Sequence, residues 1–349
     1  MKRTFQQITF IAIFLTGINL AAQSSSPSKP PQFDMNATAN IQLRMSTFDN
    51  KTNAVTDPIQ VKTVVLTSGM KLFMSVNRNE PRIFTNIPVR AGSKQDPSET
   101  TGLAHYLEHM MFKGTSIFGA LNWEKEQVAL KEIADLYEKH KAETDPSVRK
   151  ALYAKIDSAS NAAAKLVAAN EYDKLVSSLG AKATNAYTNN ESTVYVNDIP
   201  SNELEKWFQL ESERFKMVVL RLFHTELEAV YEEFNIGQDN DGRKVYQAMM
   251  SGLYPTHPYG TQTTIGRGEH LKSPSHYNIM AYFKKYYVPN NMAIVMAGDL
   301  DPDKTIALVE KTFGTYQAKE IPPFKSEEQA ILRGIQKREV VGQDRKSVV

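Results

Sequence analysis

The spacing of hydrophobic and polar residues changes along the chain, and each change predicts a different element. Apolar and polar residues follow a strand-like pattern over 61–66 and 71–76, and Ser68-Gly69 between them is typical of a hairpin turn. The run 82–90 also predicts a strand. Pro88 within it has no N–H to donate, so we expect a sheet edge or a bulge at that point.

A helical period follows over residues 102–113, with Thr101 in the position of an N-cap. Residues 123–179 are rich in Ala, Lys, Glu and Leu, with apolar residues at helical spacing. Asp145-Pro146 offers a cap followed by proline at the first helical position, and Gly180 follows the last periodic residue. The segment therefore predicts a helical hairpin and a shorter helix.

The remainder of the chain continues to alternate between the two periods. Residues 185–196 are rich in Thr, Tyr and Val and predict a strand. Helices are expected over 202–216 and from Glu226 onward, the second opened by the capping box Thr225-x-x-Glu228. Further expected elements are a helix over 276–287, a buried strand over 292–297, a helix capped by Asp301-Pro302 that reaches Phe313, and strands over 334–341 and 346–349. This order predicts an α+β domain with helices packed on a largely antiparallel sheet.

The N-terminus has the three-part pattern of a secretory signal peptide. Lys2 and Arg3 precede a mainly apolar run over 8–20, and small residues follow at Ala21-Ala22. The next stretch is rich in Ser, Pro, Asn and Thr and lacks a sustained apolar period. We therefore expect a signal peptide over 1–22, a flexible tether over 23–60 and a folded domain over 61–349. Export to the periplasm or the medium follows, with no stable membrane insertion after cleavage.

Charge and cysteine content narrow the chemistry. The 349 residues include 41 basic and 39 acidic ones, and the net charge of +2 gives no reason to expect nucleic acid as a partner. The chain has no cysteine, which excludes disulfides, thiolate ligands and a cysteine nucleophile. Any metal ion must therefore be held by histidine and carboxylate.

The main chemical motif is His105-x-x-Glu108-His109. Histidines four residues apart on a helix share a side, so His105 and His109 can bind one ion. Glu108 lies beside them, close enough to accept a proton from a metal-activated water without being a ligand. Zinc suits this set, because it accepts nitrogen and oxygen donors and lowers the pKa of bound water to about 7.

A catalytic zinc site needs a third protein ligand besides the two histidines and a water. The predicted helix after Thr225 offers four carboxylates, at Glu226, Glu228, Glu232 and Glu233. Glu226 and Glu233 are seven residues apart, or two turns, so they share a face. The other histidines have no partner at ligand spacing and are interpreted as surface or packing residues: His140, His224, His257, His270 and His276. The glycine-containing stretch 264–268 is interpreted as a turn.

Five motifs in one order resemble the inverted-motif zinc peptidases, the family of pitrilysin, insulysin and the mitochondrial processing peptidase. The resemblance covers the chain from Thr63 to its end. The motifs are residues 89–93 with 101–115, Asn185-Ala186-Tyr187-Thr188 with Glu191, Thr193 and Tyr195, residues 226–233, His257-Pro258-Tyr259-Gly260, and residues 287–292 with 297–300. Inversion of the H-E-x-x-H order is the mark of that family.

The resemblance implies roles for individual residues. Glu233 would be the third ligand of a single zinc ion, and Glu226 would orient a ligand or support the base. Glu232 does not match the family's spacing from Glu226. The strand from Asn185 through Ala186 and Tyr187 to Thr188 would be an exposed edge on which a peptide substrate adds as an extra strand, with Tyr187 lining a side-chain pocket.

The implied activity is that of a zinc-dependent endopeptidase acting on peptides or small unfolded proteins, with Glu108 as general base. The implied partner is a second homologous half, on this chain or on another subunit, because relatives enclose substrates between two halves. The segment 123–180 departs from the family as a helical insertion, and the strand-like finish at Val349 suggests a chain that ends inside the first half. The alternative is a non-catalytic binding or assembly half. A purely structural zinc site would have no use for Glu108.

Overall fold

The structure is a computed structural model that describes residues 59–326, 328, 331, 333–342 and 346–348. The expected signal peptide and all but the last two residues of the expected tether lie outside the described residues. Among the described helices, none is long and apolar enough to cross a membrane.

A six-stranded sheet forms the centre of the fold, in the order β1-β2-β6-β3-β5-β4. Its strands are β1 (Lys62–Val65), β2 (Lys71–Val76), β3 (Arg82–Val89), β4 (Lys182–Thr188), β5 (Thr193–Pro200) and β6 (Ala293–Gly298). All neighbours pair antiparallel except β2 and β6, which pair parallel. A separate antiparallel pair consists of β7 (Glu339–Val341) and β8 (Lys346–Val348). The predicted α+β class with a largely antiparallel sheet is confirmed.

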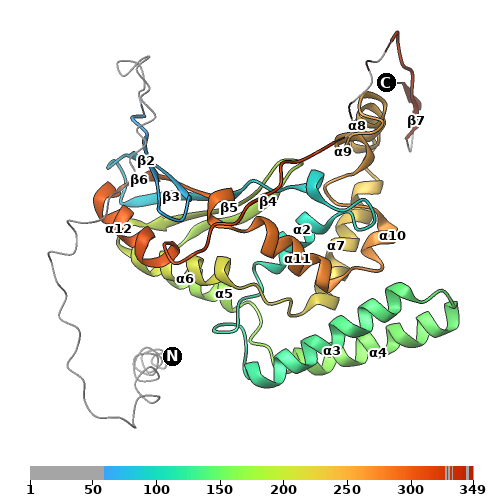
Figure 1. Cartoon of the computed structure of the whole chain (residues 1–349), viewed down its shortest axis with the longest axis horizontal. Coiled ribbons are helices and arrows are strands. Elements are labelled where there is room, and N and C mark those ends of the chain that lie inside the picture. The colour runs from blue at the N-terminus through green and yellow to red at the C-terminus, as the bar shows by residue number, and fades with distance from the viewer. Residues whose placement is uncertain (1–58, 327, 329–330, 332, 343–345, 349) are drawn as a thin grey trace, which may run out of the picture. The chain divides into compact units, whose positions relative to one another are not determined.

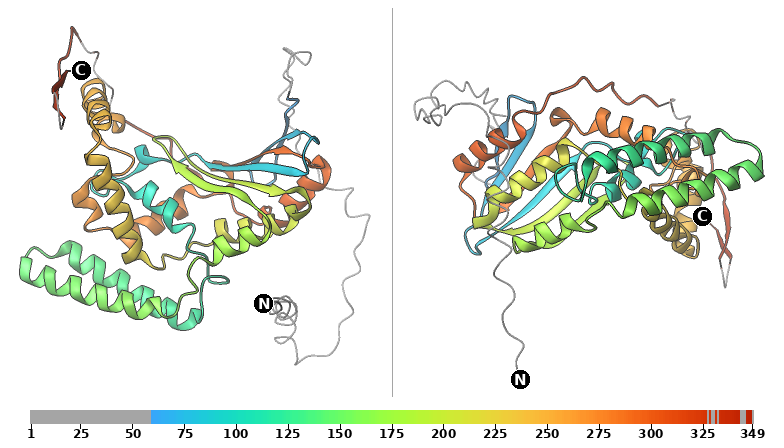
Figure 2. Two further views of the ribbon diagram at one scale, coloured as in Figure 1. Left: turned by 180° about the vertical axis from the view of Figure 1, so that it is seen from behind. Right: turned by 90° about the horizontal axis from the view of Figure 1, so that it is seen from below.

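Helices cover one face of the sheet (Figures 1 and 2). The helices of the described structure are α2 (Leu103–Met110), α3 (Trp123–Ala142), α4 (Pro146–Ala164), α5 (Glu171–Ser178), α6 (Leu204–Lys216), α7 (Phe223–Gln238), α8 (Asp241–Leu253), α9 (Pro258–Thr261), α10 (Gly268–Leu271), α11 (His276–Tyr286) and α12 (Pro302–Phe313). Of these, α8 and α9 lie beyond the end of the sheet (Figure 1). Side chains along β3 therefore alternate between buried and exposed positions. Ile83, Thr85 and Ile87 are buried, whereas Phe84 between them is 46% exposed on the other face.

Two strand predictions are corrected. β3 is an interior strand between β5 and β6, so the predicted edge position of Pro88 is wrong. Pro88 still interrupts one ladder. Continuous pairing of β3 with β6 ends at Asn86 and resumes only as an isolated bridge at Val89, because proline has no N–H to donate. The single strand predicted over 185–196 is the hairpin of β4 and β5, in which the Asn189 side chain accepts the N–H groups of Glu191 and Ser192.

Two helix-start predictions are also corrected. Thr101 does not cap α2, since Gly102 is the N-cap in a left-handed conformation with φ +85°. The carboxylate of Asp96 instead accepts the N–H groups of Gly102, Leu103 and Ala104 at 2.8, 3.2 and 2.9 Å. The capping box at Thr225 does not form, because α7 already begins at Phe223.

Other predicted features have the expected form. Gly69 adopts φ +82° in the turn between β1 and β2. Asp145 accepts the N–H groups of Ser147 and Val148 at the start of α4, and Asp301 caps α12 in the same way. The helical segment forms the hairpin of α3 and α4 and the short helix α5, as predicted.

Arg221 ties the α3–α4 hairpin to the rest of the domain. Its buried guanidinium donates to both carboxylate oxygens of Glu126 on α3, at 2.7 and 3.1 Å. It also donates to three backbone carbonyls of the loop after α2, those of Lys113, Thr115 and Phe118, at 2.8–3.0 Å. The hairpin is thus anchored at its base beside α2 and α7, and the far ends of α3 and α4 extend outward (Figure 1).

Candidate metal centre

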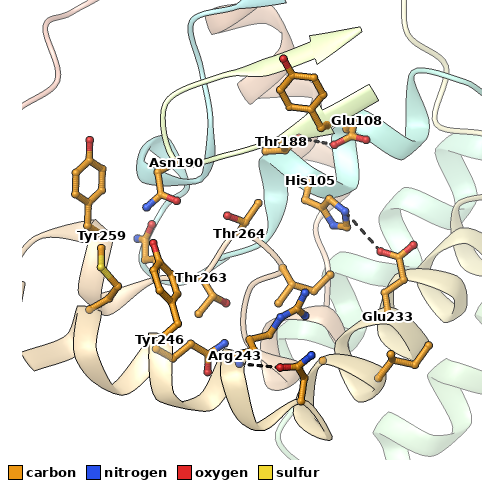
Figure 3. Close-up of a pocket in the computed structure, with 18 of the residues that line it drawn as sticks. His105, Glu108, Thr188, Asn190, Glu233, Arg243, Tyr246, Tyr259, Thr263 and Thr264 are labelled. Atoms are coloured by element: carbon orange, nitrogen blue, oxygen red, sulfur yellow. Dashed lines mark hydrogen bonds and ion pairs between the residues drawn. The ribbon is translucent and has the colours of Figure 1, made fainter. Parts of the chain in front are cut away.

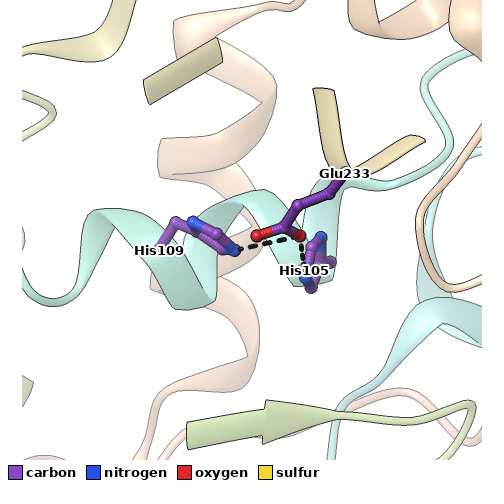
Figure 4. A group of neighbouring side chains, drawn as sticks. All are labelled: His105, His109 and Glu233. Atoms are coloured by element: carbon purple, nitrogen blue, oxygen red, sulfur yellow. Dashed lines mark ion pairs between the residues drawn. The ribbon is translucent and has the colours of Figure 1, made fainter. Parts of the chain in front are cut away.

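α2 and α7 bring three candidate ligands together. His105 and His109 lie one turn apart on α2, and Glu233 lies on α7 opposite them (Figure 4). Glu233 Oε2 is 3.6 Å from His105 Nε2 and 3.8 Å from His109 Nε2. Glu233 is 124 positions or more from the two histidines in sequence, so only packing of the two helices makes the cluster.

The geometry of the three side chains fits a zinc ion. One ligand atom of each lies within 4.8 Å of the others. A tetrahedral zinc with bonds of about 2.0–2.1 Å holds its ligand atoms roughly 3.3–3.5 Å apart, slightly closer than the separations seen here. Two imidazoles, one carboxylate and an open fourth position are the ligand set of catalytic zinc. Within the described part of the chain, no other group of three such side chains meets the same condition.

Glu226 lies behind His109, on the side away from Glu233. Its Oε1 is 2.8 Å from His109 Nδ1, and its Oε2 is 2.5 Å from the Lys113 ammonium. Burial raises the pKa of Glu226, but the contacts with His109 and Lys113 outweigh it and bring the pKa below its ordinary value. An ionised carboxylate at Nδ1 leaves Nε2 of His109 free to bind a metal ion.

Glu108 shares α2 with the histidines but contacts the sheet. Its Oε2 accepts a hydrogen bond from Thr188 Oγ1 of the edge strand β4, at 2.5 Å. Burial raises the pKa of Glu108, and the Thr188 hydrogen bond only partly offsets this effect. A carboxylate with a raised pKa is a stronger base than an exposed one, as suits proton transfer near neutral pH.

His105 differs from His109 in its charge and in the hydrogen bonding of its Nδ1. Burial, together with the nearby His109 and Arg243, lowers the pKa of His105 to about 4, so its ring is neutral and able to bind a metal. Its Nδ1 is buried and has no hydrogen-bond partner within the described residues. The Nδ1 of His109 is bonded to Glu226, whereas the Nδ1 of His105 has no such partner among the described residues.

A cavity of about 630 Å³ opens beside these residues (Figure 3). His105, Glu108 and Glu233 line one part of it, and β4 lines another through Ala186, Tyr187 and Thr188. Asn185, the fourth residue predicted for this strand, does not line the cavity, and its side-chain oxygen accepts the N–H of Ala186. β4 is the last strand of the sheet and pairs only with β5, as expected of an edge strand.

The opposite wall of the cavity was not predicted from the sequence. It is the face of α8 formed by Arg243, Tyr246, Gln247 and Met250, which follow the i, i+3, i+4, i+7 spacing. Asn240 caps this helix by accepting the N–H of Arg243 at 2.9 Å. An Asn before a periodic run is the signal that marks this helix in the sequence.

Asp96 was also missed, although it fixes the start of α2, the helix that carries His105 and His109. Burial raises the pKa of Asp96 to about 8, while its three backbone hydrogen bonds act in the opposite direction. Asp96 is eight residues before Ala104, too far for a local capping motif to reveal the contact.

The stretch 264–268 is a turn, as predicted, and it packs against the same helix start. Gly266 and Gly102 both have positive φ and touch backbone to backbone. A Cβ on Gly102 would lie 2.6 Å from the carbonyl oxygen of Ile265. Both positions therefore need glycine.

The five remaining histidines pack or cap within the described structure and join no candidate metal group. His224 Nδ1 pairs with the Tyr137 hydroxyl at 2.7 Å, and His276 packs against Phe223 with tilted rings whose centroids are 3.7 Å apart. His257 accepts the N–H of Tyr259 at the start of α9, and His270 contacts Thr101. His140 is buried in contact with Tyr153.

Two family models match the chain. The one described as insulinase, peptidase family M16, matches residues 73–129, and the one described as the peptidase M16 inactive domain matches residues 275–347. Together with the relatives below, these matches support the pitrilysin family of peptidases as the family to which this chain is similar.

The curated relatives include zinc proteases and insulin-degrading enzymes. A zinc protease of Rickettsia felis is 23% identical over 241 residues, which are 68% of this chain and 46% of the relative. The zinc protease YmxG of Bacillus subtilis is 24% identical over 277 residues, or 76% of this chain and 54% of the relative. The mouse insulin-degrading enzyme is 23% identical over 286 residues, 78% of this chain but 23% of the enzyme. The chain thus spans about half or less of the length of these relatives.

Solved structures share the fold. A protease from Helicobacter pylori matches with a TM-score of 0.59 and 22% identity, over 76% of this chain and 54% of that one. The first half of the periplasmic protease PqqL from Escherichia coli matches with a TM-score of 0.58 and 18% identity, over 77% and 49% of the two chains. The fold is therefore that of one half of such a protease.

Proposed function

We propose that this chain carries the catalytic half of a zinc-dependent endopeptidase. The observation that supports it best is the joint placement of His105, His109 and Glu233 around one point, with Glu108 beside them at the cavity wall. A structural zinc site would need a fourth protein ligand and no base, and no fourth ligand joins this group within the described residues.

Each residue of the site would have a separate role in metal binding or proton transfer. His105, His109 and Glu233 would hold one zinc ion, with Glu226 orienting His109. A bound zinc would supply Lewis acidity and a water that ionises at a pH of about 7. Glu108 would take the proton of the attacking water and pass it to the leaving amine, and Thr188 would hold its carboxylate in place.

The edge strand β4 is proposed as the peptide-binding strand. An extended peptide added there would pair with the free backbone groups of a strand that already lines the cavity. Asn185, Ala186, Tyr187 and Thr188 would contact it, with Tyr187, 52% exposed, offering an aromatic surface. Binding of this kind selects extended, unfolded segments and tolerates many sequences.

The test is hydrolysis of a mixed set of internally quenched peptides by the chain and its Glu108→Gln variant, with zinc content measured in both. Cleavage by the wild type alone, with zinc retained in both proteins, is expected. The Glu233→Gln variant should lose zinc as well as activity. The matched control is Glu232→Gln, which changes the exposed neighbouring residue and should keep both. Activity that survives in Glu108→Gln would refute the assignment of the base.

A second candidate is a non-catalytic binding or assembly half. Its support is the match of residues 275–347 to the model of the inactive domain, and the coverage of only about half of each relative. A zinc-loaded chain that cleaves no peptide alone, but does so when a second homologous half is added, would assign the activity to the pair of halves. A chain that neither binds zinc nor gains activity with that half would favour the non-catalytic role.

We further propose that the protein is exported. The signal-like pattern of residues 1–22 supports this, as does the similarity of fold to the periplasmic protease PqqL. N-terminal sequencing of the protein from a periplasmic fraction should begin at Gln23. A protein that stays in the cytoplasm with Lys2 and Arg3 in place would refute the proposal.

A further inference from the structure

Arg243 brings a positive charge into the cavity without an obvious structural task. It lies in the first turn of α8, its side chain is exposed, and it points toward His105 and Glu233 (Figure 3). Its backbone N–H binds the capping Asn240, but its guanidinium makes no hydrogen bond or ion pair within the described residues. The buried arginines of this domain differ, since Arg214 and Arg221 each pair with a glutamate.

A glycine on the metal-bearing helix makes room for this guanidinium. Gly237 lies one turn beyond Glu233 on α7, and a Cβ at that position would be only 2.1 Å from Arg243 Nη1. The guanidinium therefore lies against the backbone near the C-terminal end of α7. The carbonyl dipoles at such an end favour a positive charge. Arg243 thus lies against α7 beside the candidate metal site, and no ion pair joins it to the described residues.

The charges of the cavity leave that guanidinium without a counter-ion. Among the described residues that line it, the carboxylates, histidines and basic side chains are Glu108, Glu233, His105 and Arg243. Glu233 faces the two histidines, and Glu108 is bonded to Thr188. Arg243 is thus the one fixed cation of these lining residues, and neither carboxylate of the cavity pairs with it.

We propose that Arg243 binds a carboxylate of the peptide substrate and makes the enzyme prefer peptides that carry one near the cleaved bond. The planar guanidinium presents paired N–H donors that match a carboxylate in a two-bond arrangement. The carboxylate can be the peptide's C-terminus or the side chain of Asp or Glu, since both have the same chemistry. This inference rests on the proposed peptidase function and adds a substrate class to it.

Four matched quenched peptides test the proposal with the zinc-loaded full chain. They share one core sequence and differ in carrying Glu or Gln beside the cleaved bond and a free or amidated C-terminus. The wild type is expected to cleave at least one acidic form about tenfold or more faster in kcat/KM than the doubly neutral form, the effect of a hydrogen bond to a charged group. Whichever acidic peptide is cleaved faster shows whether the bound carboxylate is the Glu side chain or the C-terminus.

In Arg243→Gln, the ratio of acidic to neutral kcat/KM should fall by about tenfold. Lys244→Gln is the matched control, because it removes the same charge from the next residue of α8, whose side chain pairs with Asp241 and does not line the cavity. Its ratio should stay as in the wild type. Gly237→Ala should lower the ratio with Arg243 still present, by displacing the guanidinium. An unchanged ratio in Arg243→Gln, or an equal fall in Lys244→Gln, would overturn the proposal.

A binding measurement separates this inference from the peptidase proposal. Dissociation constants of the same four peptides, labelled with a fluorophore, are measured by anisotropy on the zinc-loaded Glu108→Gln chain and on its Arg243→Gln double variant. Tighter binding of a carboxylate peptide that is lost in the double variant would support the role of Arg243 even if no peptide is cleaved. Equal constants for acidic and neutral peptides on Glu108→Gln would refute it, whatever the hydrolysis assay gives.

Discussion

Acidification should destabilise this protein through His276, a histidine with no role in the candidate metal centre. Its ring is 4% exposed, lies against Phe223, and has an Nε2 without a hydrogen-bond partner in the described residues. Burial lowers the pKa of His276 from 6.5 to about 3. His276 is also the first residue of α11, and the N-terminal end of a helix disfavours a positive charge.

The sign follows from comparing the two states. The folded protein keeps His276 neutral down to a pH of about 3, whereas the unfolded chain takes up a proton below pH 6.5. Stability present above pH 6.5 is therefore lost progressively as the pH falls toward the folded pKa. Each pH unit between these values costs about 1.4 kcal/mol, so at pH 5 the loss is about 2 kcal/mol.

Urea unfolding at pH 8, 7, 6 and 5 measures this effect in the wild type, His276→Phe and His276→Asn. Neither variant can titrate at this position. The free energy of unfolding of each variant, relative to that of the wild type, should therefore rise by about 2 kcal/mol from pH 8 to pH 5, whatever the difference at pH 8. Zinc binding changes over the same range but cancels in the differences, as do the other titrating groups. A difference that stays constant to within about 0.5 kcal/mol would refute the reasoning.

Three further changes have defined outcomes. Arg221→Met should lower the free energy of unfolding by about 3–5 kcal/mol, because it leaves the buried Glu126 unpaired, and Arg221→Met/Glu126→Met should recover much of that loss in urea melts. Glu226→Ala should weaken zinc binding about 10- to 100-fold in competition with a chelating dye, since His109 loses the partner that orients it; unchanged affinity would contradict this. Asp96→Ala should cost about 2–3 kcal/mol by leaving backbone N–H groups of α2 unbonded, with Asp96→Asn intermediate; equal losses in the two variants would contradict the capping role.

What could be predicted from the sequence depended on short-range patterns. The hairpin at Gly69, the α3–α4 hairpin with its Asp145 cap and the i, i+4 histidines of α2 all depend on neighbours a few residues apart. The approach of Glu233 to His105 depends on packing across 128 residues, and there the resemblance to known peptidases supplied the choice among four glutamates.

The errors have the same physical origin. Thr101 is a good cap by type, but its hydroxyl pairs with His270 and accepts the N–H of Arg267, and the carboxylate of Asp96 accepts the N–H groups at the helix start. Pro88 favours an edge by its missing donor, yet β3 tolerates it in the interior, because the loss affects only the end of one ladder. Arg243 carried no signal of its own, since a lone arginine is usually solvated, and its place in the cavity wall is seen only in the structure.

The contact between Gly102 and Gly266 makes the metal site sensitive to a loop far away in the sequence. A methyl group on Gly266 would lie 2.5 Å from the carbonyl oxygen of Thr101 and 2.7 Å from the Cα of Gly102. This overlap could not be relieved without moving the start of α2, where Gly102 lies three residues before His105. Random mutagenesis should therefore find inactive variants at position 266 that still contain every residue of the site, and selection for activity would preserve that glycine as strictly as a ligand.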